Sequence, residues 1–472
     1  MCHGVQGLAF GSAPGLEYSE DCLFVDVFTP SVTTADSDCG LPVMVWLQGG
    51  AFVQLFNPNY NGSGIVDASY GETIVVSFNY RVGPYGFLAT EELEREGNLN
   101  IGLHDQRSAL SWVQKHIKAF GGDPDRVTLF GTSAGAGSVL LQTIAYGGIP
   151  PQDDTAHWTA GIAPAIYMPS VYQVSDLEYQ YKTLLAATNC SDINCLRALD
   201  SDDIQTANNA TLFPGDSPAA LFPYGPVIDN ELFTDHPQAM LHAGNFSRER
   251  PMVIGSSLSE GTLFAPPANS TADINKFLKL QFPALTQSDL VEAHSLYTTV
   301  PSTIPGVSVT QSDFFYKAAA MYGDVSFMCP ALEFASVLSE SNVGVYYFRN
   351  NIVDPVELAA GYVVPHTWEL QAVWGPEYAI NYVALEGSNS YDVGGANRNA
   401  VQQVQSYWIQ FATAGGKLGS SENSTITPVW SRFNNEQQRF RIQANGSAME
   451  DISQTELDRC AFWASIKSRT LI

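Results

Sequence analysis

Leu129-Phe130-Gly131-Thr132-Ser133-Ala134-Gly135 places a serine at the centre of a Gly-x-Ser-x-Gly pattern, between a short apolar run and a stretch rich in Ala, Leu and Val. A serine hydroxyl is a weak nucleophile in ordinary geometry. A sharp strand-to-helix turn exposes it to a base, and glycines permit that turn because they have no Cβ. The first N–H groups of the following helix then point at any oxyanion that forms there. The pattern predicts a nucleophile at Ser133, although a plain glycine-rich loop is the alternative in a chain with 39 glycines.

Apolar, β-branched runs alternate with helical patterns along the chain, which predicts an α/β fold. Near-continuous apolar strands indicate a mostly parallel central sheet with helices on both faces. The expected strands are 42–47, 73–78, 127–130, 252–255 and 343–348, and a helix is expected over 106–119, followed by a turn at 121–124. Segments 171–245 and 270–340 are expected to be helical excursions that cap the sheet. We find no repeat and no linker, so residues 1–472 are expected to form a single domain.

The charge balance excludes several partners. With 48 Asp and Glu against 22 Lys and Arg, the formal net charge is −26, which argues against nucleic acid. The sequence has no run of eighteen apolar residues, so no membrane span is expected, and no leader pattern follows Met1. It leaves the oligomeric state open.

Sequons and cysteines indicate the secretory pathway, and hence a secreted protein. Seven Asn-x-Ser/Thr sequons occur, at Asn61, Asn189, Asn209, Asn245, Asn269, Asn423 and Asn445. The seven cysteines lack metal-type spacing, and an odd number leaves one thiol over if the others pair. We therefore expect no metal and no cofactor.

A serine nucleophile needs a base and an acid that orients the base. His116 and His104 precede the serine; we expect His116 on a helix and His104 in a loop. In α/β hydrolases the chain order is Ser, acid, His, which leaves His294 and His366. His294 falls in a polar helical pattern, so the Pro-flanked His366 is the preferred base.

The acid should follow a strand between positions 133 and 366. Glu260 follows the strand 252–255 and is our choice, with Asp229 as the fallback. The tetrahedral oxyanion also needs donors. Gly50 and Ala51 follow the strand 42–47, and small residues there let backbone N–H groups approach the oxyanion. Together with Ala134 they are the expected oxyanion hole.

These residues and several further motifs resemble the type-B carboxylesterase/lipase (cholinesterase-like) family of α/β hydrolases, in a fungal-type secreted form. The resemblance covers most of the chain and is densest over 20–140. The matching pieces are Glu20-Asp21-Cys22-Leu23, 42–52, Asn79 to Leu88, Gly97 to Val113, Phe120 to Pro124, Glu260-Gly261, and His366 with Glu369, Val373 and Trp374.

The resemblance implies the disulfides Cys2–Cys22, Cys190–Cys195 and Cys329–Cys460, with Cys39 as the odd thiol. It also implies that the family's N-terminal segment is missing, which would leave an edge of the sheet bare. Thr132 stands where many members carry Glu, and the short Cys2–Cys22 loop lacks the tryptophan that holds choline. Both departures argue against choline esters. The short loop also argues, more weakly, against a lipase with a large lid.

The expected activity is hydrolysis of neutral carboxylic esters through an acyl-enzyme, with a small-molecule ester as the partner. Ser133 would attack the ester, His366 would carry the proton, and Glu260 would hold the imidazole. The alternatives are a lipase for longer-chain acylglycerols, a truncated protein with impaired catalysis, and a relative on the same fold that only binds.

Overall fold

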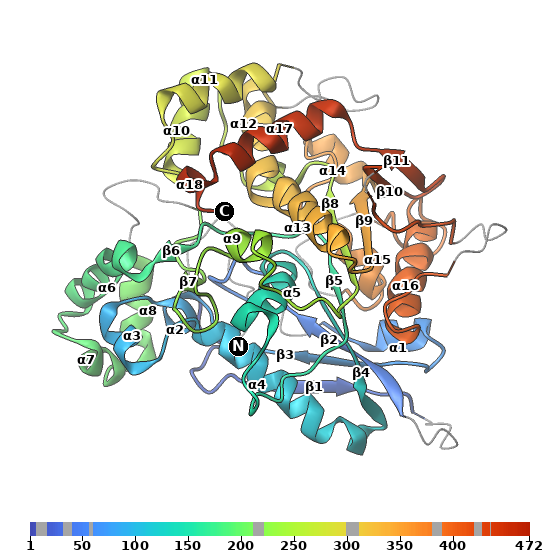
Figure 1. The fold of residues 1–472 in the computed structure, drawn as a ribbon, viewed down its shortest axis with the longest axis horizontal. Helices are drawn as coiled ribbons and strands as arrows, with labels where there is room; N and C mark the ends of the chain where they lie inside the picture. Colours follow the sequence, from blue (N-terminus) through green and yellow to red (C-terminus); the bar gives the residue numbers. More distant parts are fainter. Residues whose placement is uncertain are drawn as a thin grey trace.

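The structure is a computed structural model that describes residues 1–5, 17–31, 40–55, 60–210, 221–298, 311–379, 389–419, 427–434 and 436–472, with 209 and 210 as backbone only (Figure 1). Cys39 and Asn423 lie outside these residues.

In the described residues, nine strands form one sheet in the order β1-β3-β2-β4-β5-β8-β9-β10-β11. All neighbours from β3 to β10 pair parallel, and only the edge strands β1 and β11 pair antiparallel. The predicted mostly parallel sheet is therefore confirmed. The strands are β1 (Val25–Phe28), β2 (Leu41–Leu47), β3 (Ile74–Phe78), β4 (Gly122–Gly131), β5 (Ala160–Ala163), β8 (Met252–Ser257), β9 (Val345–Asn350), β10 (Gln438–Ile442) and β11 (Ala448–Asp451), and a separate parallel pair is β6 (Tyr172–Gln173) with β7 (Val227–Ile228).

Helices connect and cover these strands. They are α1 (Ser63–Ala68), α2 (Gly83–Phe87), α3 (Glu91–Glu96), α4 (Ile101–His116), α5 (Ala134–Ile144), α6 (Val174–Thr188), α7 (Ile193–Arg197), α8 (Ser201–Ala210), α9 (Pro237–His242), α10 (Thr271–Gln281), α11 (Gln287–Leu296), α12 (Asp313–Gly323), α13 (Cys329–Glu340), α14 (Pro355–Ala360), α15 (Leu370–Trp374), α16 (Arg398–Thr413), α17 (Gln454–Ser465) and α18 (Lys467–Thr470). A π-helical turn, Asp324–Met328, joins α12 to α13. None of the helices in the described part combines the length and apolar character needed to cross a bilayer.

Alternate side chains of each central strand enter opposite cores, because successive strand residues point to opposite faces. Val43 and Val45 pack in the core beneath α4, α5 and α13, whereas Met44 and Trp46 pack in the core beneath α15 and α16. Figure 1 shows α5 and α13 crossing in front of the sheet. Both faces are thus covered, as expected.

Two local predictions around the nucleophile were wrong. The helix before it begins at Ile101, so His104 lies on α4 and not in a loop, and its last turn, Ile117–Phe120, is 3₁₀. Strand β4 already starts at Gly122, where a turn was predicted. The reason is tertiary, since Gly122 pairs with Leu41 of β2 before a register shift leads into the main ladder.

The segments expected to cap the sheet are largely helical. Helices α6 to α9 fall in 171–245, together with the two-residue strands β6 and β7, and α10 to α13 fall in 270–340.

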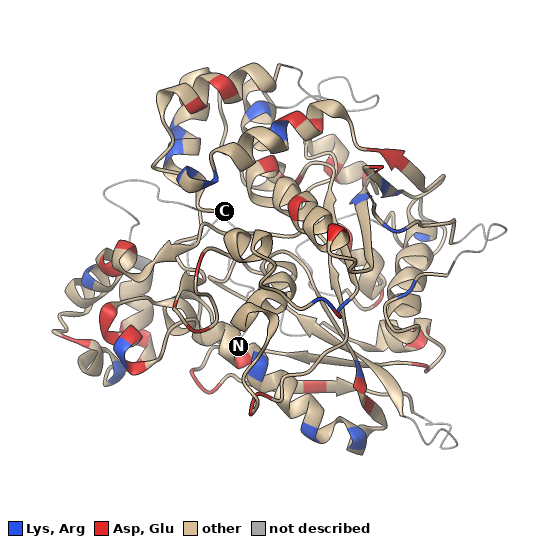
Figure 2. Cartoon of the chain, viewed as in Figure 1, with Lys and Arg blue, Asp and Glu red and all other residues tan. Residues whose placement is uncertain are grey.

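The structure contains the three implied disulfides, Cys2–Cys22, Cys190–Cys195 and Cys329–Cys460. Figure 2 shows that acidic residues, coloured red, are spread over many helices, strands and loops of the described chain, in keeping with the net charge of −26.

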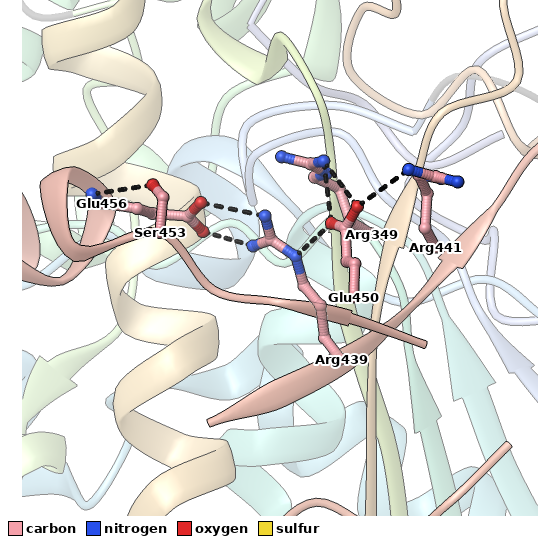
Figure 3. A network of polar contacts seen from close by, with 6 residues as sticks. All are labelled: Arg349, Arg439, Arg441, Glu450, Ser453 and Glu456. Atoms are coloured by element: carbon pink, nitrogen blue, oxygen red, sulfur yellow. Dashed lines mark hydrogen bonds and ion pairs between the residues drawn. The ribbon is translucent and has the colours of Figure 1, made fainter. Parts of the chain in front are cut away.

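A network of ion pairs fixes the C-terminal hairpin to helix α17 (Figure 3). Arg439 of β10 is only 1% exposed and donates to both carboxylate oxygens of Glu456 on α17. Glu450 of β11 accepts from Arg439 at 2.9 Å and pairs with Arg349 at 2.7 Å. These contacts hold the far edge of the sheet against the layer of helices.

Candidate active site

Ser133 lies on a sharp turn between β4 and α5. Its backbone has φ 57° and ψ −128°, a conformation that costs a non-glycine residue free energy and persists only where the surroundings enforce it. The turn is tight because the start of α5 sits against the end of β2: a Cβ at Gly135 would lie 2.0 Å from the Leu47 carbonyl oxygen. The glycines of the motif are therefore required by close backbone approach.

Three side chains that are far apart in the sequence meet at this turn. His366 Nε2 lies 2.8 Å from Ser133 Oγ, and His366 Nδ1 lies 2.5 Å from Glu260 Oε2. Ser133 is 7% exposed, His366 4% and Glu260 3%. The geometry allows the imidazole to take a proton from the serine hydroxyl while the carboxylate fixes the opposite ring nitrogen.

Glu260 begins the 3₁₀ turn that follows β8. The backbone N–H of Ser257, the last residue of β8, donates to Glu260 Oε1, which leaves Oε2 for the imidazole. The next residue must be small, because a Cβ at Gly261 would lie 1.9 Å from the Ala319 carbonyl oxygen of α12. Strand and helix together therefore fix the carboxylate.

Aromatic rings enclose the imidazole. Phe264 and Phe327 stack on each other with centroids 5.1 Å apart, and each meets the His366 ring edge-on, at 5.1 and 4.7 Å. Phe327 comes from the π-helical turn. Tyr167 and Phe222 continue this cluster next to a cavity of about 50 Å³. The surroundings of the histidine are thus apolar, which suits binding of an apolar group.

The loop after β2 lies directly over the nucleophile. A Cβ at Gly49 would lie 2.8 Å from the Thr132 carbonyl oxygen and 2.9 Å from Ser133 Cβ. Gly50, Ala51 and Phe52 have φ of 122°, 54° and 62°. Such a run of positive φ turns successive N–H groups towards one side. In the described part of the chain, no group accepts a hydrogen bond from the amides of Gly50, Ala51 or Ala134.

The other candidates lie elsewhere. Asp229 accepts from the Asn100 side chain at 2.6 Å and from backbone N–H groups of its own turn, and it makes no contact with His366. His294 pairs with Asn275 at 2.8 Å, and the His116 ring packs on Trp112. Of the candidate residues, only Ser133, His366 and Glu260 therefore lie together as a serine, a base and an acid.

Sequence reasoning gave no role to one buried carboxyl at the site. Glu369 is 2% exposed and accepts a hydrogen bond from Thr132 Oγ1 at 2.9 Å. Burial and then the charge of Glu260 raise its pKa to about 7. Its place three residues after His366, next to the mostly apolar stretch Leu370 to Trp374, was the available signal.

Within the described ranges, no three His, Cys, Asp or Glu side chains are grouped so that they could hold a metal ion.

Comparison with known families gives a match over nearly the entire chain. The model of the family described as "Carboxylesterase family" covers residues 1–463. The chain belongs to the carboxylesterase family. The expected family and the expected α/β-hydrolase fold are thereby confirmed.

Individual relatives agree with this assignment. The chain is 34% identical to Lipase 2 of Geotrichum candidum over 72% of its own length, and it spans 64% of that lipase. It is 30% identical to mouse Cholinesterase over 95% of its length and 73% of the cholinesterase. The crystal structure of Aspergillus niger EstA superposes with a TM-score of 0.88 at 35% identity, over 100% of this chain and 88% of EstA.

Proposed function

We propose that this carboxylesterase-family member hydrolyses carboxylic esters with Ser133, His366 and Glu260 as a catalytic triad. The observation that carries the proposal is the pair of contacts at His366, 2.8 Å to Ser133 Oγ and 2.5 Å to Glu260 Oε2. In this mechanism Ser133 Oγ attacks the ester carbonyl while His366 Nε2 takes its proton. The tetrahedral oxyanion is bound by the N–H groups of Gly50, Ala51 and Ala134.

The same groups complete the reaction. Collapse of the tetrahedral intermediate expels the alcohol, which takes the proton from His366 and leaves an acyl group on Ser133. Water then attacks the acyl-enzyme with His366 as base, and the acid product leaves. Glu260 holds the imidazole in the required orientation and stabilises its charged form.

Two features favour neutral substrates with an apolar part over choline esters. The rings of Phe264, Phe327, Tyr167 and Phe222 surround the site. Thr132, beside the nucleophile, donates its hydroxyl hydrogen bond to Glu369. It carries no charge that would attract a cation. The match to the Geotrichum lipases makes longer-chain acylglycerols the second candidate substrates.

The proposal extends to the extracellular location. Three disulfides are present, and the sequon residues Asn189, Asn245, Asn269 and Asn445 are exposed. Both features are typical of proteins that pass through the secretory pathway.

The test is labelling by a fluorophosphonate probe together with turnover of short-chain esters. Ser133→Ala is expected to abolish labelling and to lower kcat by roughly 10⁶. The matched control is Ser108→Ala on the exposed side of α4, which should keep both. A fall in kcat of less than tenfold in Ser133→Ala would assign the chemistry to another nucleophile.

Two further measurements refine the result. Glu260→Gln should lose most turnover while its circular dichroism stays that of the parent, since the imidazole loses its orienting charge. Rates on emulsified long-chain esters, compared with soluble short-chain esters, separate a lipase from an esterase.

A further inference from the structure

The loop after β2 carries two of the three expected oxyanion donors, and the segment after β3 holds this loop at both ends. β2 and β3 pair in parallel, so their carboxyl ends lie side by side. Tyr80, two residues after β3, is fully buried, and its hydroxyl donates to the Gln48 carbonyl oxygen at 2.7 Å. The backbone N–H of Gly83 donates to the Phe52 carbonyl oxygen at 2.8 Å. Residues 80–83 therefore bind both ends of the stretch 48–52.

The N–H groups of Gly50 and Ala51 lie between these two bound carbonyl groups along the chain. Across the residues that the structure describes, neither amide has an acceptor. No hydrogen bond of their own therefore sets the direction in which these amides point. Their direction depends on the peptide groups on either side, and those are the groups that the two bonds hold.

The loop needs such support because its backbone is strained. The φ angle is 122° at Gly50, 54° at Ala51 and 62° at Phe52, and the last two values are unfavourable for residues with a Cβ. Inside the loop, the N–H groups of Val53 and Gln54 donate to the Gly50 carbonyl oxygen at 3.0 and 3.1 Å. These two bonds close a turn, but they leave the carbonyl groups of residues 48 and 52 to the segment after β3.

We propose that Tyr80 is a positioning residue for the oxyanion hole: its hydroxyl holds the loop in the form that presents the N–H groups of Gly50 and Ala51. Gly83 holds the other end of the loop in the same form. The proposal rests on the proposed function, because it assumes that Ser133 forms a tetrahedral intermediate. Donors that are fixed before the reaction stabilise the transition state without reorganisation. Loss of the hydroxyl should therefore weaken binding of the transition state more than binding of the ester.

The first experiment removes only the hydroxyl and measures kcat, normalised by the fraction of protein that the fluorophosphonate labels at its end point. Tyr80→Phe is expected to lower kcat roughly 10-fold with KM within about twofold, because the donors are misdirected but not lost. The matched control is Tyr407→Phe. Tyr407 is buried in the core on the other face of the sheet, and its hydroxyl donates to the Pro428 carbonyl oxygen at 2.5 Å. This variant should keep kcat.

The second experiment probes the oxyanion hole with a trifluoromethyl ketone. Ser133 Oγ adds reversibly to the ketone carbon, the carbonyl oxygen becomes an oxyanion, and His366 keeps the serine proton. The adduct resembles the tetrahedral intermediate, so Tyr80→Phe should raise the inhibition constant roughly 10-fold, as much as it lowers kcat. The corresponding secondary alcohol forms no adduct and should bind to the parent and the variant equally well.

The third experiment tests the other end of the loop with Gly83→Ala. Gly83 has a φ of 58°, and a Cβ there would lie 3.3 Å from the Val53 carbonyl oxygen. Alanine should displace the Gly83 N–H and lower kcat roughly 5-fold, since small misplacements near reacting groups are costly. Gly97→Ala is the matched control, because Gly97 has a φ of 71° and no atom lies within 4 Å of an added Cβ. It introduces similar backbone strain away from the loop and should keep kcat.

The outcomes separate the two proposals. An unchanged kcat or an unchanged inhibition constant in Tyr80→Phe would overturn the role of Tyr80 while Ser133→Ala still loses activity. Equal losses of kcat in Tyr80→Phe and Tyr407→Phe would also overturn it. Activity that survives in Ser133→Ala would instead overturn the proposed function. Thermal unfolding of each variant reports its stability, and if Tyr80→Phe does not fold, the comparison of Gly83→Ala with Gly97→Ala decides.

Discussion

Ser133 shows how single residues set the geometry of this site. Its left-handed backbone is held in place by glycines on both sides, and the Gly135 position is closed to any side chain by the Leu47 carbonyl oxygen. The motif is therefore a packing requirement between β2 and α5 as much as a chemical one.

Gly135→Ala is expected to damage both stability and reactivity. Alanine favours a helix over glycine by about 1 kcal/mol, but here its Cβ would meet a backbone oxygen at 2.0 Å. Relief of such a clash moves the backbone and costs about 1–3 kcal/mol or more. Urea unfolding and fluorophosphonate labelling measure the two effects. Gly225→Ala, whose Cβ would be 3.5 Å from Pro169, is the control and should unfold like the parent.

Among the elements, the C-terminal hairpin depends on charges that a sheet face normally excludes. Arg439 is almost fully buried within the sheet edge, and it is compensated by Glu456 on α17 and by Glu450 on β11 (Figure 3). Phe440 and Ile442 alternate with the arginines and enter the core on the other face. The hairpin is thus anchored on one face by ion pairs and on the other by apolar packing.

Glu456→Gln is expected to lower the free energy of unfolding by ~3 kcal/mol, because it leaves a buried guanidinium without its bidentate carboxylate. Equilibrium unfolding in urea measures the change. Glu377→Gln breaks the exposed pair with Arg398 at 3.5 Å and should cost less than about 1 kcal/mol. Equal losses in the two variants would contradict the role given to burial.

On the scale of the whole molecule, the protein is strongly acidic, and some of its carboxyls are buried and have raised pKa values. Asp324, in the π-helical turn, accepts from Tyr297, which in turn accepts from Trp463 of α17. Burial raises the pKa of Asp324 from 3.8 to about 7. The folded protein therefore holds a proton there that the unfolded chain releases at lower pH.

The raised pKa of Asp324 makes the free energy of unfolding depend on pH. A carboxyl with a raised pKa in the folded state favours folding at low pH, and this stability is lost as the pH rises from about 4 to about 7. We expect the melting temperature to fall between pH 4.5 and 7. Asp324→Asn, which keeps an acceptor for Tyr297, should reduce the fall by about 2–4 °C in calorimetry. An unchanged slope would show that Asp324 is not the group responsible.

Much of the central sheet could be predicted from sequence, because strands buried on both faces are continuous apolar runs. β2, β3 and β8 begin within one residue of their predicted starts. β5 was missed because Ala160–Ala163 has a single β-branched residue, and β10 was missed because Arg439 and Arg441 conceal a buried strand. The residues that pair with these two strands or neutralise their charges lie far away in the sequence or on other elements. No local sequence pattern therefore predicts the strands.

The amino-acid order by itself determined the chemistry available: a serine in a glycine-bounded turn, a small-residue loop after the strand over 42–47, and a Pro-flanked histidine downstream. Local sterics and residue chemistry are enough for these inferences. Only the tertiary structure decided which groups touch, because Ser133, Glu260 and His366 come from separate crossings of one sheet whose parallel strands bring their ends together. It also decided that Glu369 lies beside them, since burial and a hydroxyl partner 237 positions away are properties of the folded chain alone.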